Sequence, residues 1–134
     1  MSLYNYVRKA FVQSFKTRNE TLKKRIEHWR KTPSVVRVLK PLNPLRARAL
    51  GYKATQDYIV VRSRIAKGKR KKRRPDLGRK PGKNRKTEPP GLPLQELAQR
   101  RAAKHFLNLT PINSYFVGED GQYKFYEVIF RKSR

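Results

Sequence analysis

The stretch NSYFVGEDGQYKFYEVIF, residues 113 to 130, decides the fold class of this 134-residue chain. Two runs rich in aromatic and β-branched residues flank the tetrapeptide GEDG at 118–121. An Asp-Gly pair between two such runs is a strong signal for a β-hairpin. We therefore predict a hairpin here, with Glu119 and Asp120 as turn residues. A short acidic turn is the opposite of a loop that cradles phosphates, so neither residue is expected to bind one.

A third strand is predicted upstream, at residues 57–65 (DYIVVRSRI), from its β-branched and aromatic content and its alternation. The inward face of this strand is expected to hold Ile59, Val61, Ser63 and Ile65. The outward face is expected to hold Tyr58, Val60, Arg62 and Arg64.

Two helices are predicted at the N-terminal end. The first has apolar residues at every fourth position, namely Leu3, Val7, Phe11 and Phe15. Thr17 followed by Glu20 is a capping-box pattern, which predicts that the second helix begins there. Pro33 is expected to end that helix near residue 31. Its apolar stripe would consist of Leu22, Ile26 and Trp29.

Two more helices are predicted on either side of the strand. Residues 43–51 (NPLRARALG) begin with an asparagine suited to the N-cap, continue with a proline at the first helical position and end with a glycine. Residues 94–107 present an apolar face made of Leu94, Leu97, Ala98, Ala102 and Phe106. The intervening residues 32–42 contain two prolines and are expected to form an extended connector.

These elements predict an α+β fold, in which a small antiparallel sheet of about three strands packs with helices. We expect one domain over residues 1–134. A basic helical region would occupy 1–56, an extended basic loop 67–91, and the helix and hairpin of 92–134 would complete the core.

The charge of the chain points to a polyanionic partner. Thirty-five Lys and Arg against nine Asp and Glu give a net charge of +26, and such repulsion needs counterions in a compact state. The absence of cysteine excludes disulfides and zinc-finger thiolates and is compatible with a reducing compartment. No apolar run is long enough for a membrane span, and the N-terminus lacks a signal-peptide pattern. We therefore expect a soluble, intracellular protein without a membrane partner.

The most basic segment is KGKRKKRRPDLGRKPGKNRK, residues 67–86, which holds twelve Lys or Arg and one Asp. It is either a solvated, disordered run or localisation signal, or a loop that contacts phosphates and becomes ordered on binding. The second interpretation is favoured because basic residues also occur outside it. The candidate contacts in this loop are Lys67, Lys69, Arg70, Lys71, Lys72, Arg73, Arg74, Arg79, Lys80, Lys83, Arg85 and Lys86.

Further candidates for phosphate contact lie upstream of the loop, although simple surface solubility would also explain them. They are expected to lie near the root of the loop and comprise Arg46, Arg48, Lys53, Arg62 and Arg64. Weaker candidates of the same kind are Arg30, Lys31, Arg37 and Lys40. Among the aromatic residues, only Tyr52 is a good candidate for stacking on a base. Core packing is expected instead for Trp29, Tyr115, Phe116, Phe125 and Tyr126.

Two motifs resemble a known family. RALGYKATQDYIVVRSRIAKGKRKK (48–72) and NSYFVGEDGQYKFYEVI (113–129), with the opening LYNYVRKAF, are similar to the archaeal and eukaryotic large-subunit ribosomal protein family numbered fifteen, distinct from the bacterial-type protein of that number. The resemblance implies a structural protein of the cytoplasmic ribosome, with large-subunit ribosomal RNA and neighbouring ribosomal proteins as its partners. Family members usually continue beyond the hairpin with another basic extension, whereas this sequence stops at Arg134. Either the extension is missing from this sequence, in which case the contacts inferred here are part of a larger set, or this member is short.

Other function classes are weaker. His28 and His105 have no cysteine or acidic cluster beside them that would complete a metal site, so no enzyme, metal or cofactor is expected. No small-molecule substrate or homo-oligomer is expected either. The main alternative is a DNA-compacting, chromatin-like protein, because contacts to the phosphate backbone alone do not separate RNA from DNA.

The first prediction concerns the basic loop. In the isolated protein, amide hydrogen exchange of residues 67–86 is expected to show no protection, because the repulsion among its cations is not compensated until a polyanion binds. Exchange measured without and with RNA checks this. Strong protection of the loop in the absence of RNA would contradict the prediction.

Overall fold

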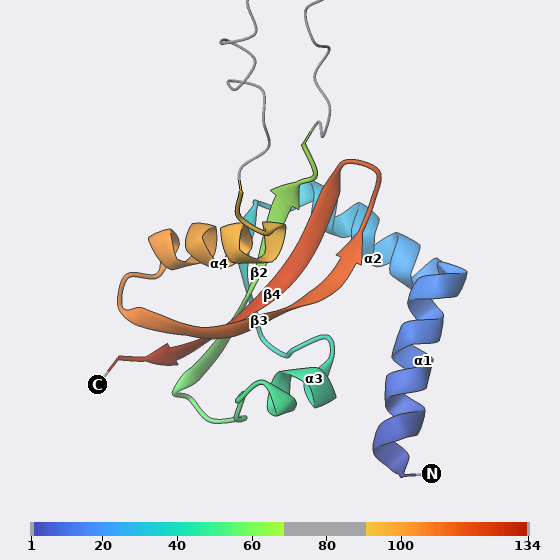
Figure 1. Ribbon diagram of the computed structural model, residues 1–134, viewed down its shortest axis with the longest axis horizontal. Coiled ribbons are helices and arrows are strands. Elements are labelled where there is room, and N and C mark those ends of the chain that lie inside the picture. The colour runs from blue at the N-terminus through green and yellow to red at the C-terminus, as the bar shows by residue number, and fades with distance from the viewer. Residues whose placement is uncertain (1, 69–90, 134) are drawn as a thin grey trace, which may run out of the picture.

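The computed structural model of the chain describes residues 2–68 and 91–133 and contains helices and one antiparallel sheet (Figure 1). The helices are α1 (Leu3–Thr17), α2 (Glu20–Lys31), α3 (Pro44–Ala49) and α4 (Leu94–His105). The strands are β1 (Val35–Val38), β2 (Tyr58–Ala66), β3 (Leu109–Glu119) and β4 (Tyr123–Lys132). The predicted α+β class is confirmed. Within the described residues, no helix is long and apolar enough to cross a membrane.

The sheet has the strand order β1-β2-β4-β3, and all its neighbours are antiparallel. The predicted hairpin is confirmed as β3 and β4, joined by a turn at Asp120 and Gly121. The fourth strand, β1, lies in the segment that was expected to be a connector. Its four residues pair with β2 from Val35 opposite Ser63 to Val38 opposite Val60, and they form one edge of the sheet.

One face of the sheet is covered by α4. Ala98 and Ala102 are completely buried on this helix and allow it to approach the strands closely. Its neighbours include Val61 and Ile65 of β2, which confirms the predicted inward face of that strand. The other buried side chains that pack here are Tyr126, Val128 and Phe130 of β4.

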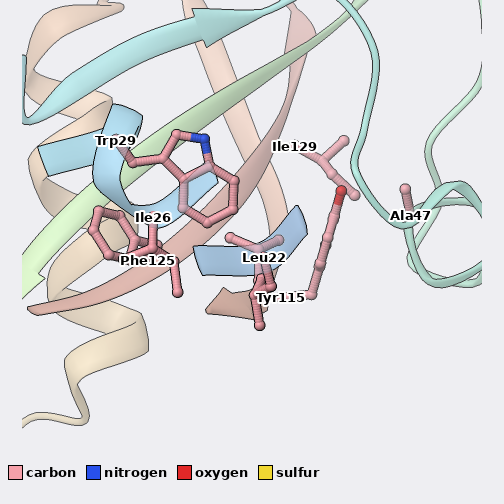
Figure 2. Packing of buried hydrophobic residues seen from close by; sticks show 8 residues of the cluster. Leu22, Ile26, Trp29, Ala47, Tyr115, Phe125 and Ile129 are labelled. Carbon is pink, nitrogen blue, oxygen red and sulfur yellow. The ribbon is translucent and has the colours of Figure 1, made fainter. Parts of the chain in front are cut away.

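The opposite face of the sheet is covered by α2 and α3, and here the apolar stripe predicted for the second helix is confirmed. Figure 2 shows Leu22, Ile26 and Trp29 facing the side chains of the sheet. The Trp29 ring lies 5.2 Å from the ring of Phe125, measured between centroids. Both faces of the sheet are therefore buried. This is why Val60, expected on a solvent face, is only 2% exposed.

Two local predictions about the N-terminal helices need correction. Thr17 does not cap the second helix, because it is the last residue of α1 and donates its hydroxyl to the carbonyl of Gln13. Asn19 is the residue before α2, and its side chain forms no capping hydrogen bond. The first helix is confirmed, but none of its residues is buried, and Figure 1 shows α1 running away from the sheet.

The predictions for the short helix and for the aromatic residues agree better with the structure. Asn43 caps α3 by accepting the amide of Arg46, and Gly51 has the positive φ, 99°, that favours glycine. Core packing is confirmed for four of the five aromatic residues, Trp29, Tyr115, Phe125 and Tyr126. It is wrong for Phe116, which lies on the edge strand β3 and is 38% exposed.

A glycine in β3 sets the distance between α2 and the sheet. A Cβ atom at Gly118 would lie 3.2 Å from Cζ3 of Trp29 and 3.7 Å from Cε1 of Phe15. Trp29 has little room to retreat, because Phe125 and the guanidinium of Arg62 also contact its ring. The absence of a side chain at 118 therefore allows the indole to pack directly against the backbone of the hairpin.

The second prediction follows from this contact. Gly118→Ala is expected to lower the free energy of unfolding by about 1–3 kcal/mol, the usual cost of overpacking a core. Gly121→Ala in the turn is a matched control, because a Cβ there meets no atom within 4 Å, and its effect should be about 0.5 kcal/mol or less. Urea unfolding followed by far-UV circular dichroism measures both. Equal effects of the two substitutions would contradict this account of Gly118.

Candidate nucleic-acid interface

A row of polar side chains crosses the sheet on the face covered by α2 and α3. Arg62, Glu127 and Tyr115 are direct neighbours on β2, β4 and β3. Glu127 is only 1% exposed, and its carboxylate accepts hydrogen bonds from the Tyr115 hydroxyl and from the amide of Leu42, the latter at 3.0 Å. The buried carboxylate therefore holds the 39–43 segment against the centre of the sheet.

The protonation of this row follows from its burial. Burial raises the pKa of Glu127, while the bonds from Tyr115 and Leu42 and the charge of Arg62 oppose the rise. Burial, together with the neighbouring charge of Glu127, raises the pKa of Tyr115, so this hydroxyl stays a donor. Burial also lowers the pKa of Arg62 despite the attraction of Glu127. Arg62 is half-buried beside the core.

The two arginines predicted to face outward from β2 instead pack on aromatic rings. The Cζ atom of Arg62 lies 4.9 Å from the centre of the Trp29 ring, and that of Arg64 lies 4.7 Å from the centre of the Tyr123 ring. Arg64 also donates from Nη1 to the carbonyl of Arg30 at 2.7 Å. The expectation that this face of β2 points to solvent is wrong, because α2 lies over it; contact of the half-buried Arg62 and Arg64 with RNA stays a prediction. Arg62 thereby joins α2 to the sheet, and Arg64 joins both α2 and the start of β4 to β2.

The hairpin turn is held by an acidic side chain. Asp120 Oδ1 accepts the amides of Gln122 and Tyr123, at 2.7 and 2.6 Å, and its Oδ2 accepts Nε of Arg30 at 2.8 Å. Burial alone would raise the pKa of Asp120, but these amides and Arg30 outweigh it and lower the pKa below its usual value. The weaker candidate Arg30 thus has an internal partner in the turn.

Two more candidate cations have carboxylate partners. Lys67, the first residue of the basic segment, lies 3.1 Å from Glu119 Oε2, and its amide donates to the carbonyl of Gln122. Lys31 lies 3.4 Å from Glu27 on the exposed surface of α2. Lys67 therefore fixes the start of the basic loop to the hairpin turn. The other loop candidates, Lys69 to Lys86, lie outside the described residues.

The remaining candidates are exposed cations without an ion-pair partner among residues 2–68 and 91–133. Arg46 and Arg48 project from α3, and Lys53 follows that helix. Tyr52 beside them is half-buried, and its ring lies edge-on to Tyr58 with 6.4 Å between centroids. The other two exposed candidates are Arg37 of β1 and Lys40 after it.

The expected clustering of the α3 candidates around the root of the basic loop is wrong. Figure 1 shows α3 beside the start of β2, whereas the chain leaves the fold for the basic segment at the other end of that strand. Nine residues at about 3.3 Å each separate the two ends. The exposed basic residues of α3 and the start of the loop thus lie at opposite ends of the sheet.

Sequence reasoning passed over several exposed cations at the junction of the first two helices, namely Lys16, Arg18 and Lys23. Periodicity assigned the two helices but gave no sign that their junction meets the hairpin turn. The sequence does contain one signal for this junction, because Arg18-Asn19 is a short break between two helical patterns. Among the described residues, no three His, Asp or Glu side chains gather where they would hold a metal ion.

Comparison with known proteins gives a family match over nearly the whole chain. Residues 2–132 match the model of the Ribosomal_L15e family, described as Ribosomal L15. The chain belongs to this family. It is also 43% identical over 129 residues to the large ribosomal subunit protein eL15 of Nanoarchaeum equitans, a match that covers 96% of this chain and 68% of that protein.

Membership in the Ribosomal_L15e family confirms the resemblance inferred from the motifs at 48–72 and 113–129. The family match includes the described parts, 2–68 and 91–132, and also spans the basic segment between them.

The third prediction concerns the hairpin turn. Asp120→Asn keeps an oxygen that can accept the turn amides but removes the charge facing Arg30, so it is expected to lower the free energy of unfolding at pH 7 by about 1 kcal/mol. Because the pKa of Asp120 is lowered in the folded state, its stabilisation is present above the ordinary value of 3.8 and is lost as the pH falls below it.

Urea unfolding of wild type and variant between pH 7 and pH 2 tests the sign. The difference between them should shrink as the pH falls below about 4. Glu119→Gln is the control, since its carboxylate is 41% exposed and its ion pairs are expected to contribute less than about 1 kcal/mol. A difference for Asp120→Asn that stays constant to pH 2 would contradict the role of the charge.

Proposed function

We propose that this protein is a structural constituent of the large ribosomal subunit and that it binds folded ribosomal RNA through phosphate contacts of its Lys- and Arg-rich segments. Family membership is the observation that carries the proposal. It supports a location on cytoplasmic ribosomes, beside other proteins of the subunit, as part of this proposal. A positioning role requires no catalytic group, and the protein acts without enzymatic activity.

The uneven charge along the chain supports separate roles for its segments, one building the core and the others contacting RNA. Residues 1–56 carry a net charge of +12 and residues 67–86 carry +11, whereas residues 87–134 carry only +2. The nearly neutral segment supplies α4 and the hairpin, which build most of the core. The core provides a rigid platform, and the two basic regions reach the RNA.

The basic side chains differ in how available they are for contact with RNA phosphates. Arg46, Arg48, Lys53, Arg37 and Lys40 are exposed and would contact phosphates without breaking a described ion pair. Arg62 and Arg64 act mainly on α2 and the hairpin, because their guanidiniums are already stacked on aromatic rings. In this proposal the loop residues Lys69 to Lys86 supply the largest share of the contacts, and the two arginines of β2 keep the platform rigid.

Shape is the feature of the RNA that such contacts recognise. Lys and Arg contacts to phosphates fix the position of a protein on the nucleic-acid backbone but carry no base sequence. RNA helices are recognised largely through backbone geometry and the 2′-hydroxyl. A preference for folded large-subunit RNA over duplex DNA therefore depends on two basic regions held at a set separation by the sheet.

The fourth prediction tests this function by competition. At matched salt, folded large-subunit RNA is expected to compete for the protein better than duplex DNA of equal phosphate concentration, and the advantage should persist as salt is raised. Equal competition at high salt would favour the DNA-compacting alternative. Filter binding over a salt series measures both affinities and the slope of log K against log[salt].

The contribution of α3 is tested in the same series. The double substitution Arg46→Gln and Arg48→Gln is expected to reduce the magnitude of the salt slope by about 1.5, since each phosphate contact contributes about 0.7–0.9. Lys104→Gln with Arg131→Gln removes the same charge from exposed positions that were not predicted to bind RNA. An equal change of slope for both pairs would contradict a specific role for α3.

A further inference from the structure

A hollow of about 470 Å³ lies where the junction of α1 and α2 meets the hairpin turn. Its floor is apolar and is formed by Phe15, Leu22, Ile26 and Phe116. Its rim carries Lys16, Arg18, Lys23 and Arg30 from the helices and Glu119, Asp120 and Gly121 from the turn. We call this hollow the junction groove. Its volume lies in the range of sites that accept small organic groups.

The floor of the junction groove presents aromatic surface. The rings of Phe15 and Phe116 lie 5.5 Å apart between centroids, and Phe116 is 38% exposed. Phe116 is also held from the side by Tyr126, whose ring lies at 5.9 Å. An aromatic side chain that is fixed by its neighbours and open on one side offers a flat surface on which a base can stack.

The rim of the groove is electropositive, although two carboxylates line it. Asp120 is engaged by Arg30 and two backbone amides, and Glu119 is paired with Lys67 and Lys124 at 3.1 and 3.9 Å. In contrast, Lys16, Arg18 and Lys23 form no ion pair with any carboxylate in 2–68 or 91–133. Three cations on the rim are thus available for an anion.

The backbone at Arg18 gives a second, independent observation. Arg18 has φ 47° and ψ 54°, the left-handed conformation that favours glycine, and it is the only non-glycine residue with positive φ among the described residues. The amides of Arg18 and Asn19 donate to the carbonyls of Phe15 and Ser14, which is the bonding of a Schellman helix end. Glycine would adopt this conformation with less strain. The presence of arginine instead indicates that its side chain has a role at the groove.

We propose that the junction groove binds a single unstacked nucleotide of ribosomal RNA. The base stacks on Phe15 and Phe116, and Lys16, Arg18 and Lys23 contact the phosphates on either side of it. This inference rests on the proposed function and adds to it a site for one base, distinct from the phosphate contacts of the basic loop. A nucleotide fits both features of the groove, because it joins a flat apolar ring to anions.

The first test separates stacking from general electrostatic attraction. The 134-residue protein is titrated with two probes, a single-stranded adenine decamer RNA and a ten-base-pair RNA duplex, at the same salt concentration. Phe116→Ala is expected to weaken binding of the single strand roughly five- to tenfold and binding of the duplex less than twofold, because a duplex has no free base to stack. Ile112→Ala, on the same strand and 42% exposed but outside the groove, should change neither.

The rim is tested with neighbouring lysines of α2. Lys23→Gln is expected to weaken single-strand binding more than Lys24→Gln, since both are exposed but only Lys23 lines the groove. Arg18→Gly removes a rim cation while relieving the left-handed backbone. It should leave the urea midpoint unchanged or raised and weaken single-strand binding about as much as Lys23→Gln. A lowered midpoint with unchanged binding would assign Arg18 a structural role and oppose the proposal.

The occupant of the groove in the ribosome is identified by cross-linking. Because the chain contains no cysteine, Lys23→Cys introduces a unique thiol for a benzophenone maleimide, and Lys24→Cys is its matched control. In isolated large subunits, a photo-cross-link from position 23 to ribosomal RNA that exceeds that from position 24 supports the proposal. A cross-link from position 23 mainly to a neighbouring protein would overturn it.

Failure of this inference differs from failure of the proposed function. If Phe116→Ala matches Ile112→Ala on the single strand while wild-type protein still prefers large-subunit RNA to duplex DNA, the groove is not a nucleotide site and the ribosomal function stands. If wild-type protein shows no preference for large-subunit RNA, the proposed function fails, and the groove proposal fails with it.

Discussion

The burial of Glu127 in the middle of the sheet is the constraint on which the other contacts depend. A carboxylate that is 1% exposed is costly unless it is hydrogen-bonded, and its two hydrogen-bond donors and its charged neighbour come from three different segments. Leu42 approaches from the connector, Tyr115 from β3 and Arg62 from β2. The requirement also specifies the register of the strands. A slip of one residue would turn Glu127 toward the apolar cluster under α4 and away from Leu42 and Tyr115.

The same face shows how a very basic chain builds a core. Arg62 and Arg64 lie over Trp29 and Tyr123, so their charges rest on aromatic faces and their side chains fill space between α2 and the sheet. Arg30 and Lys67 are paired with the acidic residues of the hairpin turn. Of the nine acidic residues in the chain, Glu119 and Asp120 bind Lys67 and Arg30 at the hairpin turn, and Glu127 binds the amide of Leu42 from the connector. The scarce carboxylates thus stabilise the places where segments meet.

Much of the fold could be predicted from the sequence, because strong local signals decide it. The Asp-Gly turn, the stripe of α2 and the Asn-Pro start of α3 each depend on neighbours within a few residues. The misses share a different cause, since they depend on what covers each face. Nothing local shows that VVRV at 35–38 pairs with β2, that α2 covers Arg62, or that Phe116 lies on an edge strand. For the candidate interface, the exposed cations of α3 were found by composition, whereas the junction groove arises only when α1, α2 and the turn meet in space.

The position of β2 has a mechanical consequence. This strand is paired on both sides, by β1 and by β4, and it connects the exposed arginines of α3 to the start of the basic segment. A nine-residue strand spans about 30 Å, and one held within a sheet changes its length very little. The strand therefore sets the distance between two cationic sites, the arginines of α3 and the start of the basic segment. Two polyanion segments that bind at these ends are kept a fixed distance apart. A polyanion can therefore bind both ends at once only if two of its segments have that separation.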